Sequence, residues 1–139
     1  MGITPTVSVG SIDLHSMAQL YLGGPRDKFT QFVEVKSTRK IVKVPSMKPY
    51  NKLVDNIQGS TLNRIMIAIL KGIQIAFRKG KRPYSRVVLQ KTNEFTIGQL
   101  LQFHMVEMMY LGYLLGVNPF DQPNVEAYKK ETRQILERG

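Results

Sequence analysis

The amino-acid sequence predicts an α/β fold, a layered sandwich in which helices flank a small, mostly parallel sheet. Short runs rich in β-branched residues alternate with longer runs of helical period, and this alternation is typical of parallel sheets. Apolar residues make up 42% of the 139 residues, enough for one folded domain over residues 1–139. The helical runs carry more apolar surface than three short strands can cover, so we expect this domain to pack against further protein.

The first expected elements are two strands with a short helix between them. Residues 6–10 alternate in polarity and are rich in β-branched side chains, which predicts a strand. Asp13 is placed to cap a helix over residues 14–21, and a Gly-Gly-Pro sequence ends that helix. Residues 29–35 form the second expected strand.

A long segment without periodicity precedes the strongest expected helix. Residues 36–59 contain two prolines, and a long loop in a compact domain usually has a function or contacts other protein, so we expect an arm here. Ser60 can cap the helix that follows, which should run to about Lys79 with an apolar stripe of helical period. Ile67 and Ile75 fall outside that stripe, which predicts burial on more than one side.

The last part of the chain should contain a third strand and two helices. Residues 84–90 form the strand. Thr96 and Gln99 have the spacing of a capping box, which would start a helix that ends at residue 115, before a glycine. An amphipathic helix over residues 124–137 follows.

Composition excludes several classes of site. There are no cysteines, so disulfides, thiolate metal ligands and a cysteine nucleophile are ruled out. The first five residues have neither the basic start nor the apolar run of a signal peptide. The longest apolar stretch, residues 97–115, is interrupted by polar side chains, which favours a buried helix over a membrane span. We therefore expect a cytoplasmic protein that does not enter the membrane.

The positive charge is concentrated in one block. Residues 36–91 contain 14 Lys or Arg and one acid, a net charge of +13, whereas the whole chain carries +10. Such a block can bind nucleic acid, face an acidic partner or an anionic substrate, or remain a solvated surface. No nucleic-acid-binding motif is present, and no aromatic side chains are interleaved with the cluster at residues 78–82, which speaks against nucleic acid.

His15 is the first candidate for chemistry. It lies near the start of a predicted helix that follows a predicted strand, the region where α/β sheets place ligands. An imidazole both accepts and donates a proton near neutral pH, so His15 suits acid–base catalysis. The alternative is a structural histidine bonded to a nearby carbonyl group.

Gln122 and Lys129 form the second candidate pair. They are seven residues apart, which on one helix places them on the same face about 10 Å from each other. An amide and an ammonium group at that spacing could hold two ends of a phosphorylated sugar. Alternatively, Lys129 is one of several exposed lysines on a surface helix, beside Lys130.

His104 lies three residues before Glu107 in the apolar helix. A His–Glu pair at this spacing could be half of a metal site, but a site needs about three or four ligands and two candidates are present. We therefore expect His104 to be a core histidine whose polar atoms are satisfied.

Three segments resemble the glucose-6-phosphate isomerase family. The run from Asn118 to Glu126, followed by Lys129, resembles the family's C-terminal signature. Residues 10–19 resemble its catalytic histidine segment, and residues 110–116 are similar to the helix that precedes the signature. The order and spacing of these blocks match the family over nearly the whole chain, which implies the C-terminal part of a sugar-isomerase-like domain.

The resemblance also implies roles. His15 corresponds to the histidine that opens and closes the sugar ring, Lys129 to the lysine near the ring oxygen, and Gln122 to a glutamine that helps hold the substrate. The family interconverts glucose 6-phosphate and fructose 6-phosphate in glycolysis and gluconeogenesis. It moves a proton between C1 and C2 through an enediol, and it uses no metal or nucleotide cofactor. Its members are dimers in which this histidine reaches the neighbouring subunit's site.

The chain departs from the family pattern in two ways. Leu14 stands where many members have glutamine, and Asn124 where many have glycine. In the family, the carboxylate that moves the C1–C2 proton, a phosphate-binding loop and a substrate-binding arginine lie upstream of the histidine segment. This chain has no counterpart of them, and no motif makes Asp13, Glu107 or Glu126 that base. We therefore expect the chain to need an N-terminal portion of the enzyme as its partner.

Three functions remain open at this point. The chain could be part of an active isomerase that acts on a sugar phosphate. It could be a basic nucleic-acid-binding module, as the charge block allows. It could also be a homologue that kept the isomerase fold without catalysis.

Overall fold

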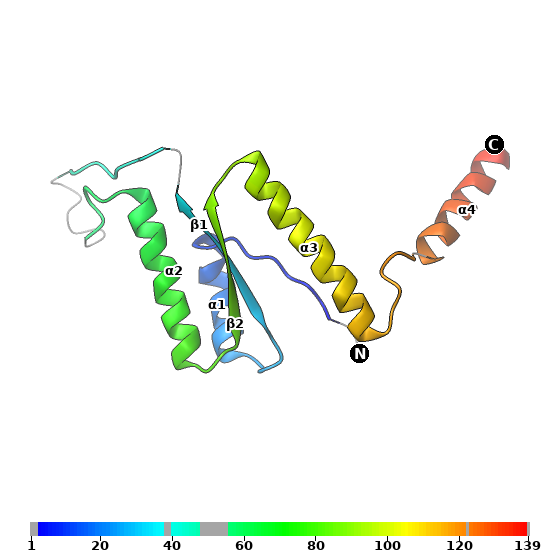
Figure 1. Ribbon diagram of the computed structural model, residues 1–139, viewed down its shortest axis with the longest axis horizontal. Helices are drawn as coiled ribbons and strands as arrows, with labels where there is room; N and C mark the ends of the chain where they lie inside the picture. The colour runs from blue at the N-terminus through cyan, green and yellow to red at the C-terminus, as the bar shows by residue number, and fades with distance from the viewer. Residues whose placement is uncertain (1–2, 38–39, 48–55, 122, 139) are drawn as a thin grey trace. The chain divides into compact units, whose positions relative to one another are not determined.

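The computed structural model describes residues 3–37, 40–47, 56–121 and 123–138. The elements follow one another in the order helix, strand, helix, strand, helix, helix, and the α/β class is confirmed (Figure 1). They are α1 (Ile12–Gly23), β1 (Thr30–Ser37), α2 (Leu62–Lys79), β2 (Tyr84–Lys91), α3 (Glu94–Leu115) and α4 (Pro123–Arg138). Residues 3–96 and residues 97–139 form two compact units. The expectation of one domain over residues 1–139 stays a prediction.

The sheet of the first unit consists of β1 and β2, which are parallel and pair from Thr30 opposite Tyr84 to Ser37 opposite Lys91. Both strands were predicted within two residues. The strand expected at residues 6–10 is wrong, because this segment has no strand partner among the described residues and Val7 is 94% exposed. Alternating β-branched residues make a strand only where another strand offers hydrogen bonds.

The segment before α1 is tied to that helix instead. The Ser8 hydroxyl lies 2.5 Å from the Tyr21 hydroxyl, and the Val9 N–H donates to the Asp13 carboxylate at 2.5 Å. Asp13 is therefore not the cap that we expected. The N-cap residue is Ser11, which has φ 82° and makes no side-chain capping bond.

The core of the first unit is an aromatic cluster between α2 and the sheet. Phe77 of α2 is 2% exposed. Its ring makes edge contacts with Phe32 of β1 at 5.2 Å and with Tyr84 of β2 at 6.1 Å between ring centroids. Such edge-to-face contacts add to the stabilisation that burial of the rings provides. Ile67 and Ile75, in contrast, are exposed, so the expected burial of α2 on several sides is not found in the described chain.

The start of α2 is held by a cap and by the described part of the predicted arm. Thr61 rather than Ser60 is the N-cap residue, and its hydroxyl accepts the Arg64 N–H at 3.2 Å. Before the helix, the Val44 N–H donates to the Ser60 carbonyl at 2.9 Å, and the Gly59 N–H donates to the Val44 carbonyl at 3.0 Å. These two bonds hold Val44 beside residues 59 and 60, directly before α2 begins.

The third helix begins earlier than predicted. The Asn93 side chain accepts the Thr96 N–H at 2.9 Å, and the Thr96 hydroxyl accepts the Asn93 N–H at 3.3 Å. The reciprocal capping pair is therefore Asn93 with Thr96, not Thr96 with Gln99. The Thr96 hydroxyl also donates to the Lys91 carbonyl at 2.6 Å, so the cap joins the end of β2 to the start of α3.

The predicted buried helix is not buried. Within the described residues, Gly112 is the buried position of α3. Phe103, Val106, Tyr110 and Leu114 are exposed, and they line an open hollow of about 380 Å³ along the helix. The expectation that the chain packs against further protein stays a prediction. In the part of the chain that the structure describes, no helix combines the length and apolarity needed to cross a bilayer.

Candidate functional site

His15 lies in the first half of α1, on an exposed part of the helix. Among the described residues, its imidazole has no hydrogen-bond or ion-pair partner, so the structural role of a histidine bonded to a carbonyl is not found. Its helical neighbours Asp13 and Ser16 make local bonds of their own, with the Ser16 hydroxyl donating to the Asp13 carbonyl at 3.3 Å. Both ring nitrogens of His15 are therefore without a partner in the part of the chain that the structure describes.

Lys129 lies on α4, one turn after Glu126. Its ammonium donates to the Glu126 carboxylate at 2.8 Å, and the two side chains are 44% and 65% exposed. An ion pair as exposed as this one contributes about 0–1 kcal/mol. It therefore orients the Lys129 side chain but leaves the ammonium group able to bind another partner. Gln122, the other member of the predicted pair, lies outside the described residues.

The loop that carries the signature is locked onto the end of α3. Gly116 has φ +67°, a left-handed conformation that glycine adopts without strain. The Gly116 N–H donates to the Tyr113 carbonyl at 3.1 Å, and the Val117 N–H donates to the Gly112 carbonyl at 3.0 Å. These two bonds form a Schellman motif, which ends a helix and reverses the chain.

The signature loop also packs on the helix directly. A Cβ atom placed on Gly112 would lie 3.0 Å from the Cβ, Cγ and Cδ atoms of Pro119. Only glycine lets the proline ring approach the helix this closely. The Phe120 N–H then donates to the Asn118 side chain at 3.0 Å, a short turn that leads toward α4. The sequence similarity of residues 110–116 and of the signature thus corresponds to one folded unit.

The three predicted site residues are not all brought together by described contacts. His15 belongs to the unit of residues 3–96 and Lys129 to the unit of residues 97–139. The contact that the structure does show is between Lys129 and Glu126. The assignment of His15, Gln122 and Lys129 as site residues therefore stays a prediction.

His104 is not the core histidine that we expected. Its Nδ1 atom lies 2.7 Å from the Glu107 carboxylate, so the pair is hydrogen-bonded, but the two side chains are 40% and 46% exposed. Within the described ranges, no group of three or more His, Asp or Glu side chains is arranged to hold a metal ion.

Two cations of the basic block have structural contacts. Arg86 of β2 pairs with Glu34 of β1 across the sheet, with its Nε atom 2.7 Å from a carboxylate oxygen. Arg82 bonds to carbonyl groups at the end of α1. Composition alone gave no sign of these contacts, because the partners of both arginines are distant in the sequence.

Comparison with known proteins places the chain in a family. Residues 53–138 match the family model described as phosphoglucose isomerase. Glucose-6-phosphate isomerase from Carboxydothermus hydrogenoformans is 38% identical over 138 residues, which are 99% of this chain and 30% of that protein. The enzyme from Streptococcus equi subsp. zooepidemicus is 36% identical over 135 residues, again 30% of its length.

A solved structure has the same fold. The crystal structure of a hypothetical protein from Thermus thermophilus superposes with a TM-score of 0.81 and 29% sequence identity, over 91% of this chain and 30% of that protein. The chain thus spans about 30% of the length of the relatives that it matches. The family-model match over residues 53–138, together with these relatives, shows that the chain belongs to the phosphoglucose isomerase family.

Proposed function

We propose that this chain is part of an aldose–ketose isomerase that interconverts glucose 6-phosphate and fructose 6-phosphate, a reaction of glycolysis and gluconeogenesis. The observation that carries the proposal is the family match over residues 53–138, which includes the signature and Lys129. The reaction moves a proton between C1 and C2 through an enediol. It needs acid–base groups and substrate anchors, and the proposal invokes no metal or nucleotide cofactor.

His15 is the acid–base group for opening the sugar ring. Ring opening requires a proton to leave the anomeric hydroxyl and a proton to reach the ring oxygen. An exposed imidazole without a competing partner in the described chain can accept one and donate the other. A positioned general acid or base typically contributes about 10²- to 10⁴-fold to the rate.

Lys129 and Gln122 hold the substrate. The Lys129 ammonium stands near the ring oxygen, where it stabilises negative charge that develops as the ring opens. Its exposed ion pair with Glu126 is weak enough to yield to a substrate oxygen. Gln122 binds the sugar toward its phosphate end. The order of these residues around the signature supports the assignment.

The remaining catalytic groups come from further isomerase polypeptide. The chain contains no motif for the carboxylate base, the phosphate loop or the substrate-binding arginine, and it spans 30% of its curated relatives. The exposed apolar face of α3 supports packing against that polypeptide. The complete enzyme is a cytoplasmic homodimer in this proposal.

A complementation assay tests the proposal. The 139-residue chain is assayed with glucose 6-phosphate alone, and then together with the part of the Carboxydothermus relative that lies outside the match. We expect negligible turnover from the chain alone and measurable turnover from the assembly. Full activity of the chain alone would contradict the assignment of the base to other polypeptide.

Variants of the assembly separate catalysis from a retained fold. His15→Asn and Lys129→Met should each lower turnover by about 10²- to 10⁴-fold. Lys130→Met is the matched control, because it removes the neighbouring lysine, and it should retain activity. An active assembly in which neither His15→Asn nor Lys129→Met changes turnover would show that this chain contributes only its fold.

A further inference from the structure

The helix that carries His15 has little support of its own. α1 is 12 residues long, none of its residues is buried, and its N-cap residue makes no side-chain capping bond. An isolated helix of about this length is only marginally stable in water, so tertiary contacts must hold it. A catalytic side chain on such a helix is only as well placed as those contacts allow.

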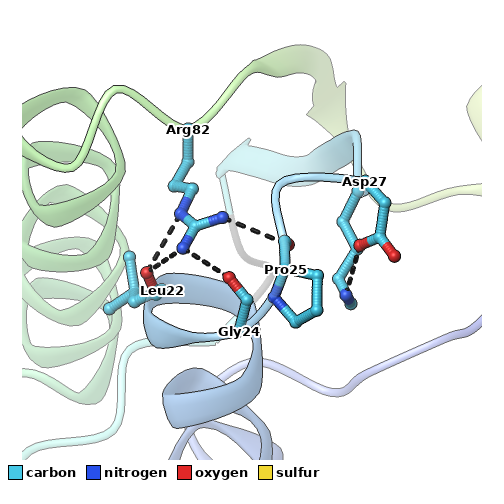
Figure 2. Close-up of polar contacts among 6 residues, drawn as sticks. Leu22, Gly24, Pro25, Asp27 and Arg82 are labelled. Atoms are coloured by element: carbon cyan, nitrogen blue, oxygen red, sulfur yellow. Dashed lines mark hydrogen bonds and ion pairs between the residues drawn. The ribbon is translucent and has the colours of Figure 1, made fainter.

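The Arg82 guanidinium supplies a contact of this kind. Its Nε and Nη2 atoms donate to the Leu22 carbonyl at 3.0 and 2.6 Å. Nη2 also donates to the Gly24 carbonyl at 2.7 Å, and Nη1 donates to the Pro25 carbonyl at 3.2 Å. Figure 2 shows the side chain reaching from the turn after α2 to the end of α1, with its nitrogens directed at the three carbonyl oxygens.

The chemistry of arginine suits this position. The last carbonyl groups of a helix lack partners within the helix, and the helix dipole favours a cation at that end. A planar guanidinium offers five N–H donors in a fixed fork, so it can bind several carbonyl oxygens at once. Lysine would keep the charge, but its ammonium is a compact point donor that cannot reproduce the fork.

Arg82 is itself anchored to the core. Its backbone N–H donates to the Phe77 carbonyl at 2.9 Å, and Phe77 is the residue that is 2% exposed in the aromatic cluster. The Gly80 N–H closes the same turn on the Ala76 carbonyl at 2.8 Å. The contacts thus run continuously from the packed side of α2, through the Arg82 side chain, to the helix of His15.

We propose that Arg82 is a positioning residue for His15. By holding the C-terminal end of α1 against the turn between α2 and β2, it sets the place of the imidazole without touching the substrate. This inference rests on the proposed function, because it gives His15 an acid–base role. It also explains one cation of the basic block as a structural group rather than as a binding surface.

The first test uses the 139-residue chain and amide hydrogen exchange. Arg82→Met and Arg82→Lys are compared with Arg86→Met, a matched control that removes an arginine four residues away and leaves the end of α1 untouched. We expect exchange in α1 to speed up by about tenfold or more in both Arg82 variants, while α2 amides change little. If Arg82→Met fails to fold, the comparison is made with Arg82→Lys alone. Unchanged protection of α1 in a folded Arg82 variant would overturn the inference.

The second test uses the active assembly and asks whether Arg82 acts through His15. Arg82→Met should lower kcat for glucose 6-phosphate about tenfold or more with a smaller change in KM, and Arg82→Lys should restore it only in part. In the His15→Asn background, Arg82→Met should cause little further loss, because the residue that it positions is absent. Equal losses in both backgrounds would overturn the positioning role. The loss of turnover in the single variant His15→Asn tests the proposed function separately. The acid–base role of His15 and the positioning role of Arg82 can therefore fail independently.

Discussion

Replacing Gly112 with alanine is the sharpest test of how the signature loop is held. The added Cβ would meet three atoms of the Pro119 ring at 3.0 Å. Carbon atoms pack best at about 3.5–4.0 Å, and a proline ring cannot rotate out of the way. The loop that leads to α4 and Lys129 must therefore move.

The expected magnitude follows from two opposed terms. Alanine in a helix interior is about 0.8–1.0 kcal/mol more favourable than glycine. Overpacking a tight contact costs about 1–3 kcal/mol. Gly112→Ala should therefore range from about neutral to about 2 kcal/mol destabilising. Gly98→Ala is the matched control on the same helix, because nothing lies within 4 Å of its Cβ position, and it should stabilise by about 0.8–1.0 kcal/mol.

Urea unfolding followed by helical circular dichroism measures both variants. The free energies of unfolding should differ by about 1–3 kcal/mol, with Gly98→Ala the more stable. In the isomerase assembly, Gly112→Ala should also lower turnover, whereas Gly98→Ala should not. If Gly112→Ala stabilises the chain as much as Gly98→Ala does, Pro119 does not pack on the helix and our account of the loop fails.

Three further predictions concern the first unit. Phe77→Ala should destabilise it by about 3–5 kcal/mol, because it empties the centre of the aromatic cluster, and a loss below about 1 kcal/mol in urea unfolding would contradict that core. Thr61→Ala should cost about 1 kcal/mol while Ser60→Ala costs little, and the reverse order would restore the cap predicted from sequence. The hydrogen bond from Lys28, aided by nearby positive charge, lowers the pKa of Asp27, so its contribution to stability is present above pH about 4 and is lost as pH falls through the lowered pKa. Lys28→Met should raise that pKa toward its usual value in a carboxyl NMR titration, and an unmoved titration would exclude Lys28 as the cause.

Much of the secondary structure was predictable because its causes are local. The apolar period of α2, the β-branched residues of β1 and β2, and the glycine after α3 act within a few residues of one another. One error arose where a distant partner decides, and the other where a different local cap is formed. The β-branched residues at 6–10 found no neighbouring strand among the described residues, and the helix expected at Thr96 begins earlier because Asn93 and Thr96 bond reciprocally.

Burial was predicted less well than secondary structure. Some side chains are of the apolar type that is usually buried, yet they are exposed in the described chain. They are Ile67, Ile75 and the apolar side chains of α3. Hydrophobicity indicates that a side chain gains from being covered, but it does not say which polypeptide covers it. His104 was placed in the core for the same reason, and it proved half-exposed beside Glu107.

The sequence by itself determined the family, because the signature from Asn118 to Lys129 is a nearly contiguous pattern of residue types. The tertiary structure decided how that signature and the His15 helix are held. Pro119 packs on Gly112 across the turn, and Arg82 reaches a helix end about 60 positions earlier in the chain. The Arg82 contact depends on which backbone carbonyls the fold leaves without partners, and the Gly112 contact depends on where the chain reverses after α3. No local pattern of residues records either.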